Sequence, residues 1–117
     1  MAAIVQDACL ETAVADLLEI GVTPAASGLP VRVCVSGEVD FHNAAALREI
    51  LLIALTVHRS TLLLDMRDVT FCDCAGINAL LIARLAAVRA GRRLRVTAAS
   101  RPVERLLHLT ATRSLLT

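Results

Sequence analysis

One junction between a predicted strand and a predicted helix constrains the fold of this chain most strongly. An apolar run at 61–72 is followed directly by the tetrapeptide Asp-Cys-Ala-Gly at 73–76. We read 61–65 as a short buried strand, and the periodic segment 75–90 as a helix that ends at Gly91, a residue suited to a left-handed cap. Cys74 therefore lies at a helix N-terminus, where unpaired N–H groups and the helix dipole stabilise the negative charge of a thiolate or a phosphate.

Strands and helices are expected to alternate along the rest of the chain. Two strand candidates, 17–22 and 31–36, are joined by a turn region at 24–30 that contains prolines and a glycine. A helix is predicted at 43–57, before the junction, and a strand at 94–97 and a helix at 100–109 are predicted after it. A hairpin followed by alternating helices and strands predicts an α/β domain with a mixed sheet and helices largely on one side.

The helix predicted at 43–57 has one apolar face and a polar residue at its start. The apolar face consists of Leu47, Ile50, Leu51, Ala54 and Leu55. Asn43 is placed where its side chain can cap the first turn. We therefore expect this helix to pack on the sheet.

The helix predicted at 75–90 has two separable faces. The residues expected to face the core are Ile77, Leu80, Leu81, Leu85 and Val88. A second set, the Cys74 stripe, consists of Cys74, Asn78 and Ile82, with Ala75, Ala79 and Ala86 close to it. If the stripe faces solvent, its small residues and one apolar side chain suit close approach by a partner. The alternative is that Ile82 simply widens the buried face.

The length of 117 residues allows one core and little more. We expect a single domain at 17–117 and an N-terminal extension at 1–16 that is either a loose helix or disordered. Hydrophobic residues make up 56% of the chain, but the longest apolar stretch, 50–57, is too short to span a membrane. Because the first residues also lack a signal-peptide pattern, we expect a cytoplasmic protein without a membrane span.

The charge pattern argues against nucleic-acid binding. The net charge is +1, the twelve basic residues are all arginine, and the only aromatic residues are Phe41 and Phe71. This composition, with abundant alanine, indicates the coding bias of a GC-rich bacterium. The one basic cluster consists of Arg89, Arg92, Arg93 and Arg95. We read it as a helix C-terminus favoured by the dipole and an exposed strand face, since nucleic-acid sites usually have broader patches and aromatic platforms.

The cysteines predict reduced thiols, with no disulfide framework, metal site or cofactor. They are Cys9, Cys34, Cys72 and Cys74. The spacing of Cys72 and Cys74 is too tight for the usual zinc pair, and the three histidines lack metal-site spacing. Cys34 lies in a predicted strand and is expected to be a small core residue. No phosphate loop, Ser-His-Asp arrangement or acid–base pair is present, so we expect no enzymatic activity.

Several of these features, taken in order, resemble the STAS domain, a module shared by sulphate transporters and anti-sigma factor antagonists. They begin with a Gly-Glu-Val-Asp turn at 37–40 after the second strand, followed by Asp65 at the end of a strand and the Asp-Cys-Ala-Gly loop at 73–76. Gly91, the strand at 94–97 and the helix at 100–109 follow, so that the resemblance covers about residues 17–116. It implies a STAS-type mixed sheet of about four to five strands with three to four helices.

The resemblance implies a bacterial regulator that binds an anti-sigma factor, an ATPase-type protein kinase, and so releases a sigma factor by partner switching. The resemblance and the Cys74 stripe together predict the partner-binding residues Asp40, Asp73, Cys74, Ala75, Gly76, Asn78 and Ile82. Asp65 and Asp68 are expected instead to flank a turn and cap backbone groups. A metal or pKa-coupled role for the four aspartates is the alternative reading.

The chain departs from the family pattern at the phosphoacceptor. The family has Asp-Ser-Ser-Gly where this chain has Cys74 and Ala75, which implies that the usual serine phosphorylation does not occur. The glycine often found near the end of the last helix is also replaced, by Ala111-Thr112. The alternatives left open are a redox-responsive scaffold or thiol enzyme using Cys74, and a structural STAS subunit of a stress-signalling complex. A homodimer is also left open.

Overall fold

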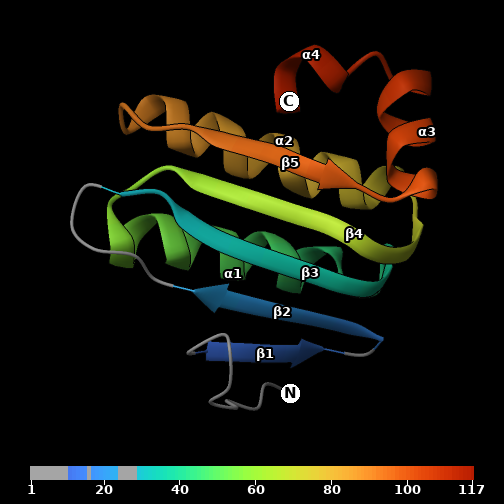
Figure 1. Ribbon diagram of the computed structural model, residues 1–117, viewed down its shortest axis with the longest axis horizontal. Helices are drawn as coiled ribbons and strands as arrows, with labels where there is room; N and C mark the ends of the chain where they lie inside the picture. Colours follow the sequence, from blue (N-terminus) through green and yellow to red (C-terminus); the bar gives the residue numbers. More distant parts are fainter. Residues whose placement is uncertain (1–10, 16, 24–28) are drawn as a thin grey trace.

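Five strands form a single mixed sheet in the order β1-β2-β3-β4-β5 (Figure 1). The computed structural model describes residues 11–15, 17–23 and 29–117. The strands are β1 (Glu11–Ala15), β2 (Leu18–Thr23), β3 (Val31–Val39), β4 (Leu62–Cys72) and β5 (Leu94–Ala99). Strand β2 runs antiparallel to β1 and β3, whereas β3, β4 and β5 are parallel. The predicted mixed sheet is confirmed.

Four helices connect and flank the described strands. They are α1 (Ala44–His58), α2 (Cys74–Arg89), α3 (Arg101–Leu109) and α4 (Arg113–Leu116). Helices α1 and α2 lie together behind the sheet, while α3 and α4 lie at its β5 side (Figure 1). The expected helical layer on one face is therefore present. None of these helices is both long and apolar enough to cross a membrane.

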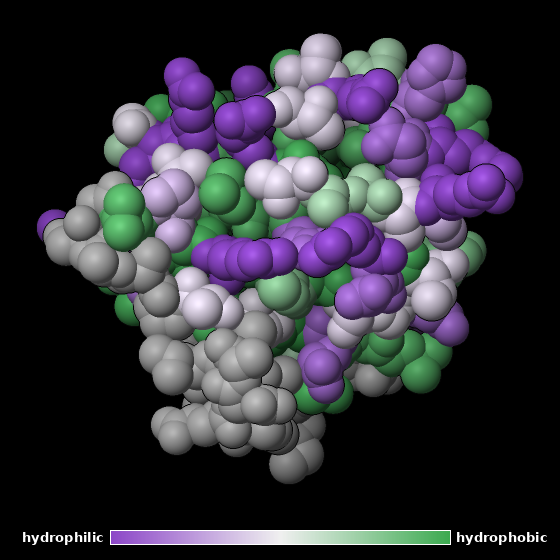
Figure 2. Space-filling model, in the orientation of Figure 1, coloured by the Kyte–Doolittle hydropathy of each residue, from purple (hydrophilic) through white to green (hydrophobic). Residues whose placement is uncertain are grey.

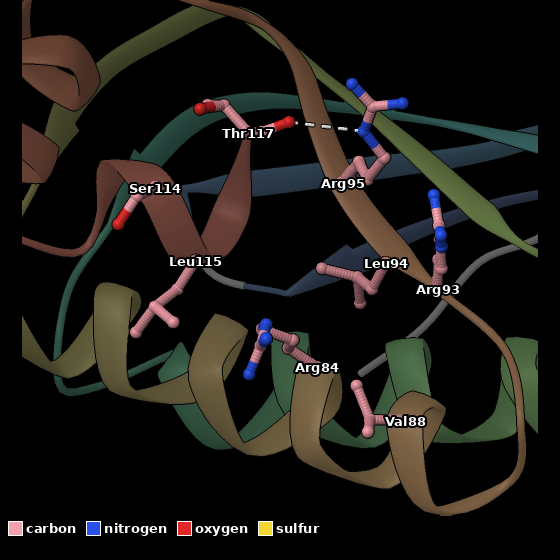
Figure 3. Close-up of a pocket in the computed structure, with 8 residues that line it drawn as sticks. All are labelled: Arg84, Val88, Arg93, Leu94, Arg95, Ser114, Leu115 and Thr117. Carbon is pink, nitrogen blue, oxygen red and sulfur yellow. Dashed lines mark hydrogen bonds between the residues drawn. The ribbon is translucent and has the colours of Figure 1, made fainter.

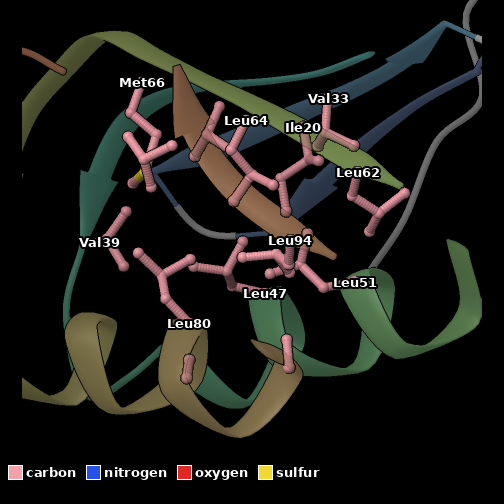
Figure 4. Close-up of a cluster of buried hydrophobic side chains, with 14 of the residues drawn as sticks. Ile20, Val33, Val39, Leu47, Leu51, Leu62, Leu64, Met66, Leu80 and Leu94 are labelled. Atoms are coloured by element: carbon pink, nitrogen blue, oxygen red, sulfur yellow. The ribbon is translucent and has the colours of Figure 1, made fainter. Parts of the chain in front are cut away.

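The core lies between the sheet and the pair α1 and α2. Val31, Val33 and Val35 alternate with exposed or half-buried residues along β3, as expected for a strand with one buried face. Leu47 and Leu51 of α1 are fully buried against this face, as is Leu80 of α2 (Figure 4). The predicted face of α1 is confirmed, with Ile50 at its half-buried margin.

The other face of the sheet is polar, and no helix of the described residues covers it. Hydrophilic side chains extend across the middle of this face (Figure 2). Asp65 accepts hydrogen bonds there from Arg32 at 3.0 Å and from Arg67 at 2.7 Å. The prediction that Cys34 is a core residue is wrong. Cys34 is half-buried, because positions 32, 34 and 36 of β3 alternate with the buried valines and so lie on the polar face.

The buried face of α2 differs from the predicted one. Ile77 and Leu80 are buried and Leu81 is half-buried, but Leu85 and Val88 are 47% and 50% exposed. The buried face is completed by three alanines spaced by four, Ala79, Ala83 and Ala87. Because α2 carries apolar residues all round, helical periodicity does not identify the face that packs. Small alanine side chains on the buried side let α2 approach its neighbours closely.

Several element boundaries also differ from those predicted. Residues 11–15 form a strand, not a loose helix or a disordered segment, while 1–10 and Cys9 lie outside the described residues. Strand β4 continues to Cys72, so Asp65 and Asp68 lie within a strand and do not flank a turn. The glycine at 37 also lies inside a strand, β3, at φ +97°; a Cβ there would approach the carbonyl oxygen of Leu17 to 2.0 Å. This glycine allows β3 to continue through an irregular register with β4.

Candidate functional site

The loops that follow β3 and β4 lie side by side at one end of the sheet. This neighbourhood follows from the parallel pairing of the two strands, whose last residues, Val39 and Cys72, are partners in register. The backbone N–H of Asp73 donates to the carbonyl oxygen of Val39 at 3.1 Å. The structure thus brings together the two loops that contain Asp40 and Asp73.

The Asp40 loop is held by hydrogen bonds within the loop. Asp40 Oδ1 accepts from the backbone N–H of His42 at 2.9 Å and from that of Asn43 at 3.3 Å. Asn43 is buried; its Oδ1 accepts from the Asp40 N–H at 2.9 Å, and its Nδ2 donates to Glu38 O at 2.7 Å. The prediction that the Asn43 side chain caps α1 is wrong. The side chain forms hydrogen bonds with the preceding loop and none with the first turn of α1.

Asp73 caps the N-terminus of α2. Its Oδ1 accepts from the backbone N–H of Ala75 at 2.9 Å and from that of Gly76 at 3.3 Å. Cys74 is exposed at the first helical position, as predicted. Because the Asp73 carboxylate already uses two first-turn amides, those groups are not open to a thiolate or a phosphate at Cys74.

Gly76 lets α2 lie close to the ends of β3 and β4. It is buried, and a Cβ at this position would lie 2.7 Å from Val39 Cγ1 and 2.8 Å from Cys72 Sγ. The buried Cys72 thiol has its pKa raised to about 12, mainly by burial and also by the nearby Asp73 charge. Cys72 is therefore a protonated packing residue at neutral pH.

The Cys74 stripe is exposed along α2. Cys74 and Asn78 are exposed, and Ile82 is 37% exposed, so Ile82 does not simply widen the buried face. Ala75 is half-buried at the start of the stripe, and Ala79, expected close to it, is buried. The outward-facing stripe runs from the Asp73 loop along about two turns of the helix.

Both aromatic residues of the chain are exposed at this same end, which the sequence reasoning missed. Phe41 follows Asp40 and is 70% exposed; its ring lies 4.0 Å from that of His42. Phe71 is 47% exposed and pairs in register with Glu38 of β3. Exposed phenylalanines beside two loops are typical of interaction surfaces. In the sequence, Phe41 directly follows Asp40 at the end of a strand, and this position was the signal that could have identified it as a site residue.

This end of the sheet also carries negative charge. Glu38, Asp40 and Asp73 lie near the end of β3 or in the loops that follow β3 and β4. Within the described part of the chain, the ion pairs involve Asp65 and Glu104, and none involves these three carboxylates. Asp68 lies further back on β4, where its charge interacts with Arg67. Among the residues that the structure describes, no group of three or more His, Cys, Asp or Glu side chains is arranged to hold a metal ion. The site thus combines acidic loops, two aromatic rings and a helix stripe.

The chain is similar to known STAS proteins in both sequence and structure. A family model described as "Mlab, STAS domain" matches residues 22–117. An anti-sigma factor antagonist from Mycobacterium paratuberculosis superposes with a TM-score of 0.73 at 23% identity, covering 88% of this chain and 86% of that one.

Two further solved structures share the fold. The unphosphorylated anti-sigma factor antagonist SpoIIAA has a TM-score of 0.66 at 17% identity, over 84% of this chain and 85% of its own. The STAS domain of an antisigma-factor antagonist from Rhodobacter sphaeroides has a TM-score of 0.59 at 18% identity, over 74% of this chain and 96% of its own. No curated protein matches the chain in sequence. The family match over 22–117 shows that this chain belongs to the STAS domain family.

Proposed function

We propose that this protein is an anti-sigma factor antagonist that binds an anti-sigma factor of the ATPase-type kinase class and so releases a sigma factor. The observation that carries the proposal is the junction of the Asp40 and Asp73 loops, at which the exposed Cys74 stripe begins. It lies on a fold shared with anti-sigma factor antagonists. Such a partner places the protein in the cytoplasm, in a binding role without catalysis of its own.

The binding surface has an apolar and an acidic part. Phe41 and Phe71 are exposed apolar side chains beside the two loops, and Ile82 is one on the stripe; such groups suit burial against a partner, and Cys74 and Asn78 leave room for close approach. The surrounding carboxylates favour a partner with basic residues, because complementary charges steer association. Ala75 contributes at the margin, while buried Gly76 holds the loop and α2 in position.

The usual phosphorylation switch has no acceptor in this surface. Neither Cys74 nor Ala75 carries a hydroxyl. The Thr70 hydroxyl lies upstream on β4 and donates to the carbonyl oxygen of Gly37 at 3.2 Å. The Ser100 hydroxyl is buried at the start of α3. We infer that this protein is not switched off by phosphorylation and stays able to bind its partner.

A structural STAS subunit is the second candidate. Leu85 and Val88 extend the exposed apolar character of α2 beyond the stripe. Permanent interfaces are more apolar than transient ones, so these residues suit a constitutive assembly. Size-exclusion chromatography of a native-host extract distinguishes the two candidates: a stable large particle favours the subunit, and exchange between free and kinase-bound forms favours the antagonist.

The binding surface can be tested with paired charge substitutions. Wild-type protein, Asn78→Arg/Ile82→Arg and the control Ile53→Arg/Val57→Arg are used to capture partners from the native host, and affinity for the identified anti-sigma factor is measured by calorimetry. Ile53 and Val57 are exposed on α1 and are also spaced by four. An anti-sigma kinase that binds wild type and control but not the Asn78/Ile82 variant supports the proposal. Equal binding to all three proteins, or absence of an anti-sigma factor, contradicts it.

A further inference from the structure

Helix α2 presents an exposed ridge on the side that faces away from the sheet. The ridge consists of Cys74, Asn78, Ile82, Leu85 and Arg89, which are spaced by three or four residues and so share one face of the helix. All five residues are exposed, whereas the alanines at 79, 83 and 87 pack on the buried side. We call these five residues the α2 ridge.

The α2 ridge carries less charge than the outward face of a surface helix normally does. Among the 16 residues of α2, only Arg84 and Arg89 are charged. Arg84 and Val88 line a pocket between α2, β5 and α4 (Figure 3), so they lie beside the ridge. A helix with apolar residues on both its inward and its outward side is typical of a helix that is covered on both sides. The composition of α2 therefore indicates that a partner covers the ridge.

The two ends of α2 differ in charge, and this difference indicates which partner fits. The loops that contain Asp40 and Asp73 lie at the N-terminal end, Arg89 lies in the last turn, and the exposed Arg93 follows four residues later. Two copies of α2 packed antiparallel bring the acidic end of each helix against the basic end of the other. A parallel pair would instead bring like charges together. The ridge is thus complementary in charge to a second, antiparallel copy of itself.

The ridge also matches itself residue by residue about a two-fold axis placed midway between Ile82 and Leu85. This axis sets Ile82 of each copy against the partner's Leu85, so that four exposed apolar side chains become buried. The same axis sets Asn78 against the partner's Arg89, whose guanidinium can donate to the amide oxygen. An isologous contact of this kind satisfies both the apolar and the polar part of the ridge.

We propose that two copies of this protein form a homodimer through their α2 ridges, packed antiparallel about this axis. The dimer covers Asn78 and Ile82, so a second copy and the anti-sigma factor proposed above compete for the same residues. The dimer itself does not rest on that proposed function, because it forms in the purified protein without another partner.

The test is analytical ultracentrifugation of the purified full chain over a range of concentrations, with a reducing agent present. We expect the wild type to show a monomer–dimer equilibrium. Leu85→Arg should weaken dimerisation by about tenfold or more, because it places a charge in the apolar centre of the contact. Leu109→Arg is the matched control: Leu109 is 70% exposed on α3, outside the ridge, so this change should leave the dimer constant within about twofold.

An exchange of charge tests the antiparallel orientation. Arg89→Glu should weaken the dimer, because the new carboxylate faces the acidic end of the partner. Adding Asn78→Arg should restore it, since position 78 of one copy meets position 89 of the other only in an antiparallel pair. A wild type that stays monomeric at the highest soluble concentration, equal effects of Leu85→Arg and Leu109→Arg, or no recovery in the double variant would overturn the proposal.

Discussion

The backbone N–H of Asp73 donates to the carbonyl oxygen of Val39 at 3.1 Å and so joins the two loops of the candidate site. Gly76 makes this junction possible, because its missing side chain leaves space for Val39 and Cys72. The loop that follows β3 and the start of α2 therefore form one unit. A substitution at the junction should affect both stability and binding.

Gly76→Ala should destabilise the protein by about 1–3 kcal/mol, since the added Cβ overpacks the junction. The free energy of unfolding is measured by urea denaturation. A double-mutant cycle with Val39→Ala supplies the control: the combined variant should lose less stability than the sum of the single losses. Strict additivity would show that the Gly76–Val39 contact does not limit packing.

Leu80→Ala should cost about 2–5 kcal/mol of stability, because this side chain is fully buried. Leu81→Ala should cost about 1–2 kcal/mol, since Leu81 is only half-buried. Leu85→Ala, at an exposed position, should cost less than about 0.5 kcal/mol. Chemical denaturation of the three variants gives the order of the losses, and a larger loss at Leu85 than at Leu80 would reverse the assigned face of α2.

Ala111→Gly should stabilise the protein by about 0.5–1 kcal/mol. Ala111 has φ +55°, in the left-handed region that glycine adopts at lower cost. Gly91→Ala is the reciprocal control: Gly91 has φ +73° and a Cβ added there would meet open space, so the loss should reflect backbone conformation alone. Thermal and urea denaturation of both variants should give changes of opposite sign; a gain in both cases would refute the backbone explanation.

Asp65→Asn should lower stability by about 1–2 kcal/mol at pH 7, after allowance for the solvent-exposed arginine partners. Hydrogen bonds from Arg67, and also from Arg32, lower the pKa of Asp65 from 3.8 to about 2, against the opposing effect of burial. Because the pKa of Asp65 is lower in the folded state than in the unfolded state, the ionised carboxylate stabilises the protein at pH values above the unfolded-state pKa. This contribution is lost as the pH falls from 3.8 through 2.

Urea denaturation at several pH values checks this sign. The difference between wild type and Asp65→Asn should shrink progressively below about pH 4. Asp68→Asn, at an exposed position on the same strand, is the control and should change stability by less than about 0.5 kcal/mol. A difference that stays constant down to pH 2 would exclude Asp65 ionisation as its cause.

Cys74→Ser should create a phosphorylation site that the wild-type protein lacks. The wild type, Cys74→Ser and the control Ala75→Ser are incubated with the partner anti-sigma kinase and ATP, and mass spectrometry detects added phosphate. Phosphate at position 74 adds nearly two negative charges to an already acidic surface, so binding should fall. Phosphate on the wild type with loss of binding would overturn the inference of constitutive binding.

The sequence by itself determined the order of the main elements and the position of the candidate site. Gly91 and the apolar periodicities are local signals; they identified the helix ends closely, but not the ends of β3 and β4 or the capping of α1. These local signals were sufficient to predict the mixed sheet, to recognise the STAS resemblance and to place Cys74 at the start of α2. These features depend on residues close together in the chain.

Tertiary structure decided what depends on residues far apart in the chain. Leu85 and Val88 are exposed because alanines occupy the packed side of α2, and a helix that is apolar all round gives no periodic indication of that choice. Asp65 lies inside β4 because Arg32 from the neighbouring strand and Arg67 compensate its charge. The pocket around Arg84 likewise exists only where α2, β5 and α4 meet, since its walls come from segments separated in sequence but adjacent in the fold.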